Sequence, residues 1–188
     1  MSEWRIPLFD LDYGPEETEA ALRVLENRWL SMGPETADFE NRFAEMLGIE
    51  HAFAVSSGTA ALHLAYLLLE LKSGDEIIQP AVNFVAAANM TLAAGAKPVF
   101  ADILSLEEPT IDPGEVERLM TSRTRAIVVM HYGGYLCRMG ELAKICRKRG
   151  VALIEDACHA VEHGTRTPKA GSPRAAWPAH WVTQGVFH

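Results

Sequence analysis

The sequence predicts an α/β fold in which a mostly parallel sheet is flanked by helices. Short apolar runs rich in β-branched residues alternate with segments whose apolar residues recur at helical spacing, and 48% of the 188 residues are apolar. Strands separated by helices run parallel and are covered on both faces. A chain of this length and composition can bury a sizeable core.

The first part of the chain predicts three helices and one strand. A helix over residues 15–28 has Pro15 in its first turn and its apolar residues on one face. Residues 35–47 repeat this pattern and are followed by a glycine, a frequent helix stop. A short strand over 51–55 then precedes a helix over 59–71.

From residue 76 onward, strands and helices are expected to alternate. Asp112 and Pro113 suit the cap and the first residue of a helix, and basic residues end the helix that follows the fourth strand of the chain. The expected strands cover residues 76–79, 97–103, 126–131 and 151–156, and the expected helices cover 85–94, 112–120 and 139–149.

Bulk properties exclude several classes of function. The net charge of −8 argues against nonspecific nucleic-acid binding. Cys137, Cys146 and Cys158 form neither a CxxC pair nor a zinc spacing, which indicates reduced thiols in the cytoplasm. There is no leader pattern, and apolar stretches fall short of the ~20 residues of a membrane helix. We expect a cytoplasmic protein with no metal, nucleic-acid or membrane partner.

The composition changes near residue 163. All 25 acidic residues lie at or before Glu162, while residues 163–188 hold prolines and tryptophans without a helical or strand period. We therefore expect one truncated α/β domain over residues 1–162 and an aberrant, poorly structured tail over 163–188.

A phosphate-binding turn is indicated at residues 56–62. Small polar residues and a glycine lie between an apolar segment and a helix, so free N–H groups and the helix dipole can face an anion. Gly58 permits close approach, and Ser57 or Thr59 can donate a hydroxyl. An ordinary capped helix is an equally good explanation, and neither a Walker loop nor GxGxxG is present.

An acid follows the last expected strand. Ligands of α/β sheets bind beyond the carboxyl ends of strands, and Asp156 there can keep a ring nitrogen protonated. A helix cap or surface acid is the alternative. His159 can hydrogen-bond Asp156 or the ring, or serve as a structural histidine. The acid and the phosphate turn together favour pyridoxal phosphate as cofactor.

Two further segments follow expected strands. Phe84 can stack on a flat cofactor, although core packing is the more common role of an aromatic residue. The run His131-Tyr132-Gly133-Gly134 fits a tight turn beside a ligand, with His131 and Tyr132 as polar contacts, and equally fits a plain loop.

Ordered motifs over roughly residues 5–162 resemble the DegT/DnrJ/StrS family of sugar aminotransferases. They are Trp29-Leu30-Ser31-Met32-Gly33-Pro34, SSGTAAL at 56–62, Gly74-Asp75-Glu76, Asn83-Phe84-Val85-Ala86, Pro98-Val99-Phe100-Ala101-Asp102, His131-Tyr132-Gly133-Gly134 and Glu155-Asp156-Ala157-Cys158-His159. The resemblance implies an aspartate-aminotransferase-like fold, a homodimer and pyridoxal phosphate. It also implies amino transfer from an amino acid such as glutamate to a nucleotide-linked keto sugar.

The resemblance assigns roles to several residues. It implies Gly58, Thr59 and Ala60 at the phosphate, Phe84 on the ring, Asp156 at the pyridine nitrogen and His159 beside it.

The lysine that forms the Schiff base in the family has no match here. The lysines are Lys72, Lys97, Lys144, Lys148 and Lys169, and none lies in the motif that carries it. Some relatives replace that lysine with histidine and act as sugar dehydratases, but the surroundings of His188 do not match. We expect an inactive, truncated aminotransferase; the alternatives are a dehydratase and a noncatalytic ligand-binding or inert fragment.

Codon degeneracy permits a simple origin for the tail. Codons of residues 180–188 read from their third base permit Leu-Gly-Asp-Thr-Gly-Cys-Phe-Ser, the family segment before the lysine. We expect DNA sequencing to show that restoring one frame near codons 162–169 opens a longer frame with this segment and then a lysine. A stop codon before any lysine in that frame would contradict the expectation.

Overall fold

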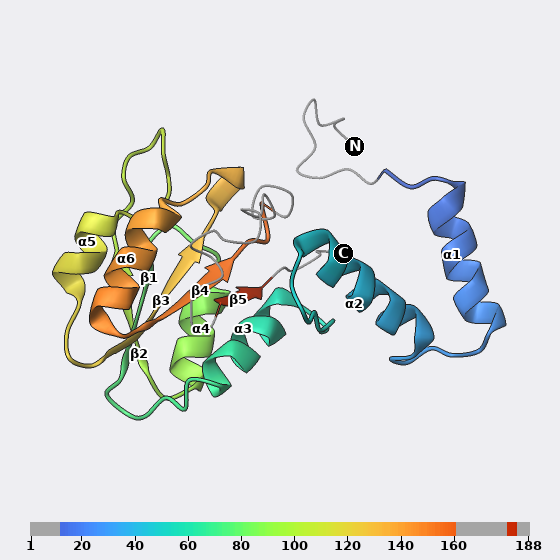
Figure 1. Ribbon diagram of the computed structural model, residues 1–188, viewed down its shortest axis with the longest axis horizontal. Coiled ribbons are helices and arrows are strands. Elements are labelled where there is room, and N and C mark those ends of the chain that lie inside the picture. The colour runs from blue at the N-terminus through green and yellow to red at the C-terminus, as the bar shows by residue number, and fades with distance from the viewer. Residues whose placement is uncertain (1–11, 161–179, 184–188) are drawn as a thin grey trace, which may run out of the picture. The chain divides into compact units, whose positions relative to one another are not determined.

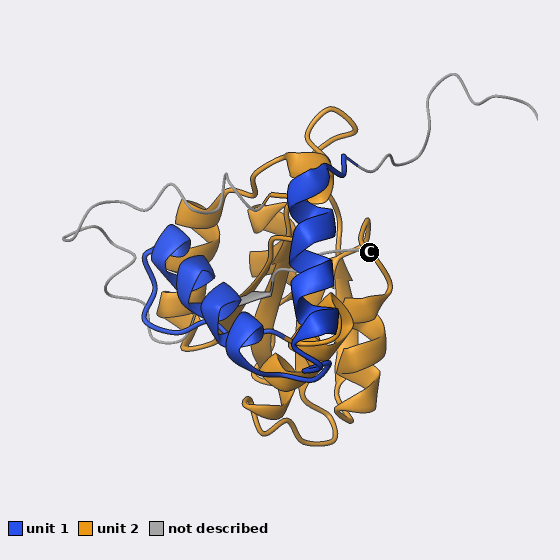
Figure 2. Cartoon of the chain, turned by 90° about the vertical axis from the view of Figure 1, so that its right-hand side faces the viewer, with its two compact units in different colours: residues 1–54 blue, residues 55–188 orange. Residues whose placement is uncertain are grey.

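The computed structural model describes residues 12–160 and 180–183 (Figure 1). The chain divides into two compact units, residues 1–54 and residues 55–188, which Figure 2 shows in blue and orange.

The described part of the first unit, residues 12–54, holds two helices, both close to their expected positions. α1 spans Pro15–Glu26, with Pro15 in its first turn, and the Glu17 carboxylate accepts the N–H of Gly14 (2.7 Å). α2 spans Pro34–Leu47 and ends at Gly48, whose φ of 63° is the left-handed conformation that glycine favours.

The expected strand over 51–55 is wrong. These residues form no strand, and the side chain of Phe53 is 81% exposed. A strand needs a neighbouring strand to take its hydrogen bonds, whereas here the N–H of Ala54 donates to the Glu40 carboxylate of α2 (2.7 Å). The β propensity of residues 51–55 is therefore not realised, and a hydrogen bond to the Glu40 side chain takes the place of a bond to a neighbouring strand.

The second unit is built on a five-stranded sheet with the order β2-β1-β3-β4-β5, and every pair of neighbours is parallel. The chain passes from β1 to β2 on one side and then to β3 on the other side of β1. The strands span Glu76–Pro80 (β1), Lys97–Ala101 (β2), Thr124–Met130 (β3), Ala152–Asp156 (β4) and His180–Thr183 (β5). The predicted parallel α/β sheet is confirmed.

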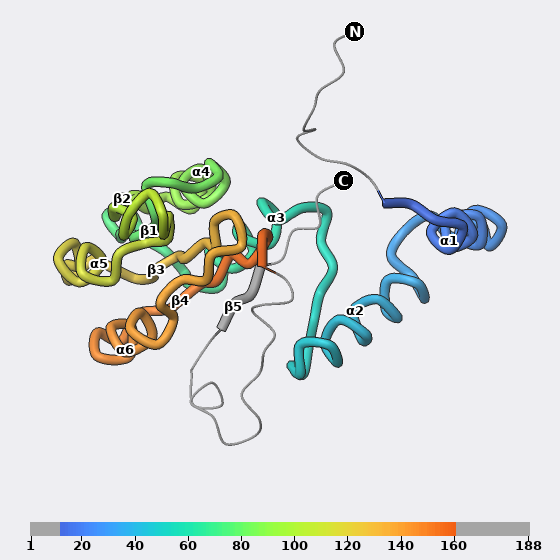
Figure 3. The backbone as a smooth tube through the Cα atoms, turned by 90° about the horizontal axis from the view of Figure 1, so that it is seen from above, coloured from blue at the N-terminus to red at the C-terminus, as the bar shows by residue number. Residues whose placement is uncertain are grey.

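Helices of the described part of the chain cover both faces of the sheet (Figure 3). α3 (Gly58–Leu67) and α4 (Ala86–Ala93) pack on the face that carries Ile77, Val128 and Ile154. The opposite face carries Ile78 and Ile127 under α5 and α6. These two helices span Pro113–Leu119 and Met139–Arg149, and a short 3₁₀ turn, η1, spans Tyr132–Gly134.

The expectation of an unstructured tail fails for β5. His180–Thr183 pairs in parallel with Leu153–Asp156 of β4. The outer edge of β4 offers a row of backbone donors and acceptors, and a segment with tryptophan, valine and threonine suits such an edge. The rest of the expected tail, residues 163–179 and 184–188, lies outside the described residues.

No helix within residues 12–160 is both long and apolar enough to cross a membrane. α2, with 14 residues, carries charged side chains along its length.

A buried carboxylate at the start of β1 predicts acid sensitivity. Thr121 Oγ1 donates to Glu76 Oε2, and the Arg123 guanidinium lies 2.7 Å from Oε1. The Thr121 bond first, and Arg123 second, hold the pKa of Glu76 below its usual value. Because this carboxylate ionises more readily when folded, its stabilisation is complete above about pH 4.5 and is lost as the pH falls through its folded pKa.

Glu76→Gln is therefore expected to lower the free energy of unfolding by about 1.5–3 kcal/mol at pH 7, the range for hydrogen bonds to charged groups. Urea unfolding at pH 7 and pH 3 should show the difference shrinking in acid. Glu117→Gln removes an exposed pair with Lys148 and should have little effect at either pH. A Glu76→Gln difference that is the same at both pH values would contradict the prediction.

Candidate active site at the carboxyl edge of the sheet

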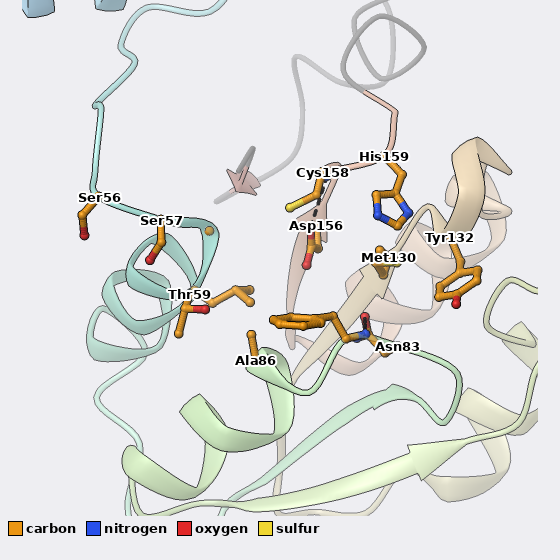
Figure 4. A pocket seen from close by; sticks show the side chains of 13 residues that line it. Ser56, Ser57, Thr59, Asn83, Ala86, Met130, Tyr132, Asp156, Cys158 and His159 are labelled. Carbon is orange, nitrogen blue, oxygen red and sulfur yellow. Dashed lines mark hydrogen bonds between the residues drawn. The ribbon is translucent and has the colours of Figure 1, made fainter. Parts of the chain in front are cut away.

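A cavity of about 430 Å³ lies where the carboxyl ends of β1, β3 and β4 meet the first turn of α3 (Figure 4). A volume of this size suits a small organic ligand. The cavity is lined by Ser56, Ser57, Gly58, Thr59, Leu62, Asn83, Phe84, Ala86, Met130, Tyr132, Asp156, Cys158 and His159.

The first turn of α3 forms one wall. Ser57 caps the helix, and its Oγ accepts the N–H of Ala60 (3.2 Å). The N–H groups of Gly58 and Thr59 lie before the first intrahelical bonds, so they remain available to an anion. Ala60, predicted to contact the phosphate, does not line the cavity, and its N–H is bonded to Ser57. The other residues predicted at the phosphate, Ser57, Gly58 and Thr59, do line it.

Asp156 comes from the last position of β4. Its side chain is buried, and Oδ1 accepts the N–H of Cys158 (3.2 Å), the bond drawn as a dashed line in Figure 4. This bond leaves the second carboxylate oxygen for a ligand. Sequence reasoning placed the acid correctly because parallel strands bring their carboxyl ends to one edge.

Tyr66 connects α3 to α4, the helix that follows β1. It is fully buried, and its hydroxyl donates to the carbonyl of Ala87 in α4 (3.3 Å). Burial raises the pKa of Tyr66 to about 12, and the negative charge of Asp156 adds to this effect. The phenol therefore stays protonated, and it holds the two helices that border the cavity together.

The segment after β1 supplies a flat aromatic surface. Phe84 is 57% exposed, which excludes the core-packing alternative, and its N–H donates to Asn83 Oδ1 (2.7 Å). The Asn83 Nδ2 group is buried and finds no hydrogen-bond partner among the described residues. Sequence analysis did not assign Asn83 to the site, although its position one residue before Phe84 at a strand end was a usable signal.

The two histidines of the motifs take different roles. The ring of His159 lines the cavity, where its Nδ1 accepts the N–H of Gly133 (3.1 Å), and it contacts Tyr132 edge-on with ring centres 5.9 Å apart. Of the roles considered for His159, a hydrogen bond to Asp156 is not seen among the described residues; a contact with the ring of a cofactor stays a prediction. His131, considered a possible ligand contact, is absent from the lining and bonds Glu155 instead.

Other residues of the lining had no individual prediction. Met130 ends β3, and Cys158 lies two positions beyond β4. Both follow from strand ends once the topology is known, but the sequence does not give the order of strands across the sheet.

No lysine lines the cavity in the described part of the chain. The lysines there are Lys72, Lys97, Lys144 and Lys148, all with exposed side chains. Residues 12–160 and 180–183 also contain no cluster of histidine, cysteine and carboxylate side chains able to hold a metal ion.

Comparison with known proteins decides the family. The model of the DegT/DnrJ/EryC1/StrS aminotransferase family matches residues 12–175. The chain belongs to this family. The DegT/DnrJ/EryC1/StrS resemblance predicted from the motifs is confirmed, and so is the aspartate-aminotransferase-like fold class.

A curated relative from Saccharopolyspora spinosa, dTDP-4-dehydro-2,3,6-trideoxy-D-glucose 4-aminotransferase, is 41% identical over 81% of this chain and 40% of its own length. The structure of the aminotransferase TlmJ from Streptoalloteichus hindustanus is similar with a TM-score of 0.77 and 38% identity, over 84% of this chain and 43% of that chain. The pyridoxal-phosphate form of a sugar aminotransferase from Streptococcus pneumoniae matches with a TM-score of 0.77 and 25% identity, over 84% of this chain and 44% of that chain. The chain thus spans about two fifths of the length of the relatives it matches.

Proposed function

We propose that this chain carries the cofactor-binding half of a pyridoxal-phosphate-dependent aminotransferase site of the sugar-nucleotide type. The observation that carries the proposal is one cavity with a helix N-terminus on one wall and the Asp156 carboxylate on another. The activity named for the 41% identical relative supports a nucleotide-linked keto sugar as acceptor. An amino acid such as glutamate is proposed as donor from the family resemblance.

The residues present fit pyridoxal phosphate. The amides of Gly58 and Thr59, with the Ser57 hydroxyl, would hold the phosphate, and Phe84 would lie against the ring. Asp156 would keep a proton on the ring nitrogen. When bound, the cofactor supplies an electron sink for moving an amino group. His159 would face the ring from the end of the cavity that Tyr132 borders.

We propose that this chain by itself binds the cofactor but does not catalyse amino transfer. The family's lysine provides both the covalent anchor and the base that moves a proton, and no lysine of the described residues lines the cavity. This observation favours the noncatalytic ligand-binding alternative for the chain by itself. The dehydratase alternative depends on His188, which lies outside the described residues. A homodimer is proposed for the chain from its membership of the family.

Cys158 offers a direct test of the cofactor site. Burial raises the pKa of both Cys137 and Cys146 to about 12, so these thiols should resist alkylation. Cys158 lines the cavity and should react first with iodoacetamide. Pyridoxamine phosphate, which lacks the aldehyde, should slow that reaction about tenfold at ten times its Kd.

Mass spectrometry of alkylated peptides measures the three rates separately. Pyridoxamine without phosphate is the matched control and should protect far less, because it lacks the group that the α3 N-terminus would hold. Equal protection by both compounds, or none by either, would contradict the proposed function.

A further inference from the structure

A buried histidine–glutamate pair lies behind the cavity and has no role in the site described so far. The Nε2 of His131 is 2.8 Å from Glu155 Oε1, and both side chains are almost completely buried. Neither residue lines the cavity. A buried ionisable pair is costly to desolvate, so it needs an explanation beyond packing.

The hydrogen bonds fix the proton on His131. Its Nδ1 accepts the N–H of Cys137 (3.1 Å), so Nδ1 carries no proton. The ring is therefore the neutral tautomer that donates Nε2–H to Glu155. Cys137 also donates its thiol to the carbonyl of Met130 (3.2 Å). These two hydrogen bonds join Cys137 to Met130 and His131, so the two ends of the segment 130–137 are held together.

The turn η1 lies within this segment, and its Tyr132 lines the cavity. The backbone carbonyl of His131 accepts the N–H of Gly134 (3.0 Å). The backbone N–H of His131 donates to the carbonyl of Asp156 (3.2 Å). Gly133 and Gly134 have φ of 61° and 86°, a conformation that other residues rarely adopt. This geometry directs the Gly133 N–H at Nδ1 of His159.

We propose that the Glu155–His131 pair is a positioning device that, through Gly133, fixes the tautomer of His159. Because a backbone N–H occupies Nδ1, the proton of neutral His159 lies on Nε2. His159 then presents a hydrogen-bond donor to a ligand in the cavity. A Cβ on Gly134 would lie 3.4 Å from the His159 carbonyl, so the turn and the histidine pack closely. The inference rests on the proposed function only for the identity of the ligand.

Nitrogen-15 NMR of the histidine rings in the full chain, without added cofactor, tests this device. The His159 signals are assigned with His159→Gln. The wild type is expected to show Nε2 protonated and Nδ1 bare. Glu155→Ala and His131→Gln should populate the other tautomer and should speed hydrogen exchange of the Gly133 amide at least about tenfold, since a hydrogen bond of ~1.4 kcal/mol corresponds to that factor.

Two further variants separate positioning from stability. Glu155→Gln keeps an oxygen acceptor for Nε2–H and should restore the wild-type tautomer. Glu76→Ala removes a buried carboxylate at the opposite end of the sheet, so it should destabilise the protein without changing the His159 signals.

Several results would overturn the device. They are a proton on Nδ1 of wild-type His159, unchanged His159 signals in folded Glu155→Ala and His131→Gln, or a change of the same size in Glu76→Ala. If Glu155→Ala and His131→Gln do not fold, hydrogen exchange of the wild type decides. The backbone amides of Gly133 and Cys137 should then exchange at similar rates. Much faster exchange of the Gly133 amide would contradict the coupling. Binding of pyridoxamine phosphate is measured separately, so the proposed function can fail while the device stands, and the reverse.

Discussion

Asp156→Ala is expected to weaken binding of pyridoxamine phosphate by roughly 10- to 150-fold. The carboxylate is the only acid that lines the cavity in the described residues, and a hydrogen bond to a charged group contributes about 1.5–3 kcal/mol, which corresponds to that range. A fluorescence titration with the cofactor at pH 7.5 gives the two dissociation constants.

Two variants make this result specific. Asp156→Asn retains an oxygen for the N–H of Cys158 but removes the charge, so it should lose most of the binding while keeping the local fold. Asp102→Ala replaces an exposed acid that follows β2 and does not line the cavity, and it should bind like the wild type. Binding by Asp156→Ala within twofold of the wild type would refute the role assigned to this carboxylate.

The chain is also expected to catalyse no measurable amino transfer from glutamate to a nucleotide-linked keto sugar. General acid–base groups are worth about 10²–10⁴-fold in rate, and the family's lysine additionally anchors the cofactor. Incubation with pyridoxal phosphate, reduction with borohydride and peptide mass spectrometry should find only scattered modification of lysines, among them the exposed Lys72, Lys97, Lys144 and Lys148.

The control for this experiment is a full-length relative with the family's lysine, which should be labelled at one position and should turn over. A single, saturable label on one lysine of this chain, accompanied by amino transfer, would contradict the prediction. In that case the lysine would have to reach the cavity from outside the described residues.

Periodicity predicted the core of the second unit well because local and tertiary preferences agree there. The boundaries shifted by only a few residues, as at β3, which begins at Thr124 rather than at residue 126. The failure at residues 51–55 shows the limit: Phe53 and Val55 favour a strand locally, but these residues form no strand, and the Ala54 N–H bonds to a side chain of α2 instead. β5 shows the opposite case, in which a segment without periodicity pairs with the edge that β4 offers.

Residues of the site could be predicted where their position follows from the local sequence alone, as at the start of a helix or the end of a strand. Ser57, Gly58 and Thr59 at a helix start, and Asp156 at a strand end, could be named from their neighbours in the sequence. Alternation along a strand predicts only that Glu155 and Asp156 point to opposite faces. That Glu155 meets His131 depends on β3 lying beside β4, and this register is not visible in a single sequence.

The strand order has a consequence for synthesis of the protein. β1 lies between β2 and β3, yet β3 leaves the ribosome last of the three. Once β2 has emerged from the ribosome and until β3 follows, a nascent β1–β2 pair would expose one open backbone edge, for a time on the order of seconds at ordinary elongation rates. Ile77 and Ile78 belong to that edge strand. During this interval the open edge can pair with another chain, so chaperone capture should concentrate on nascent chains from which β2 has emerged and β3 has not.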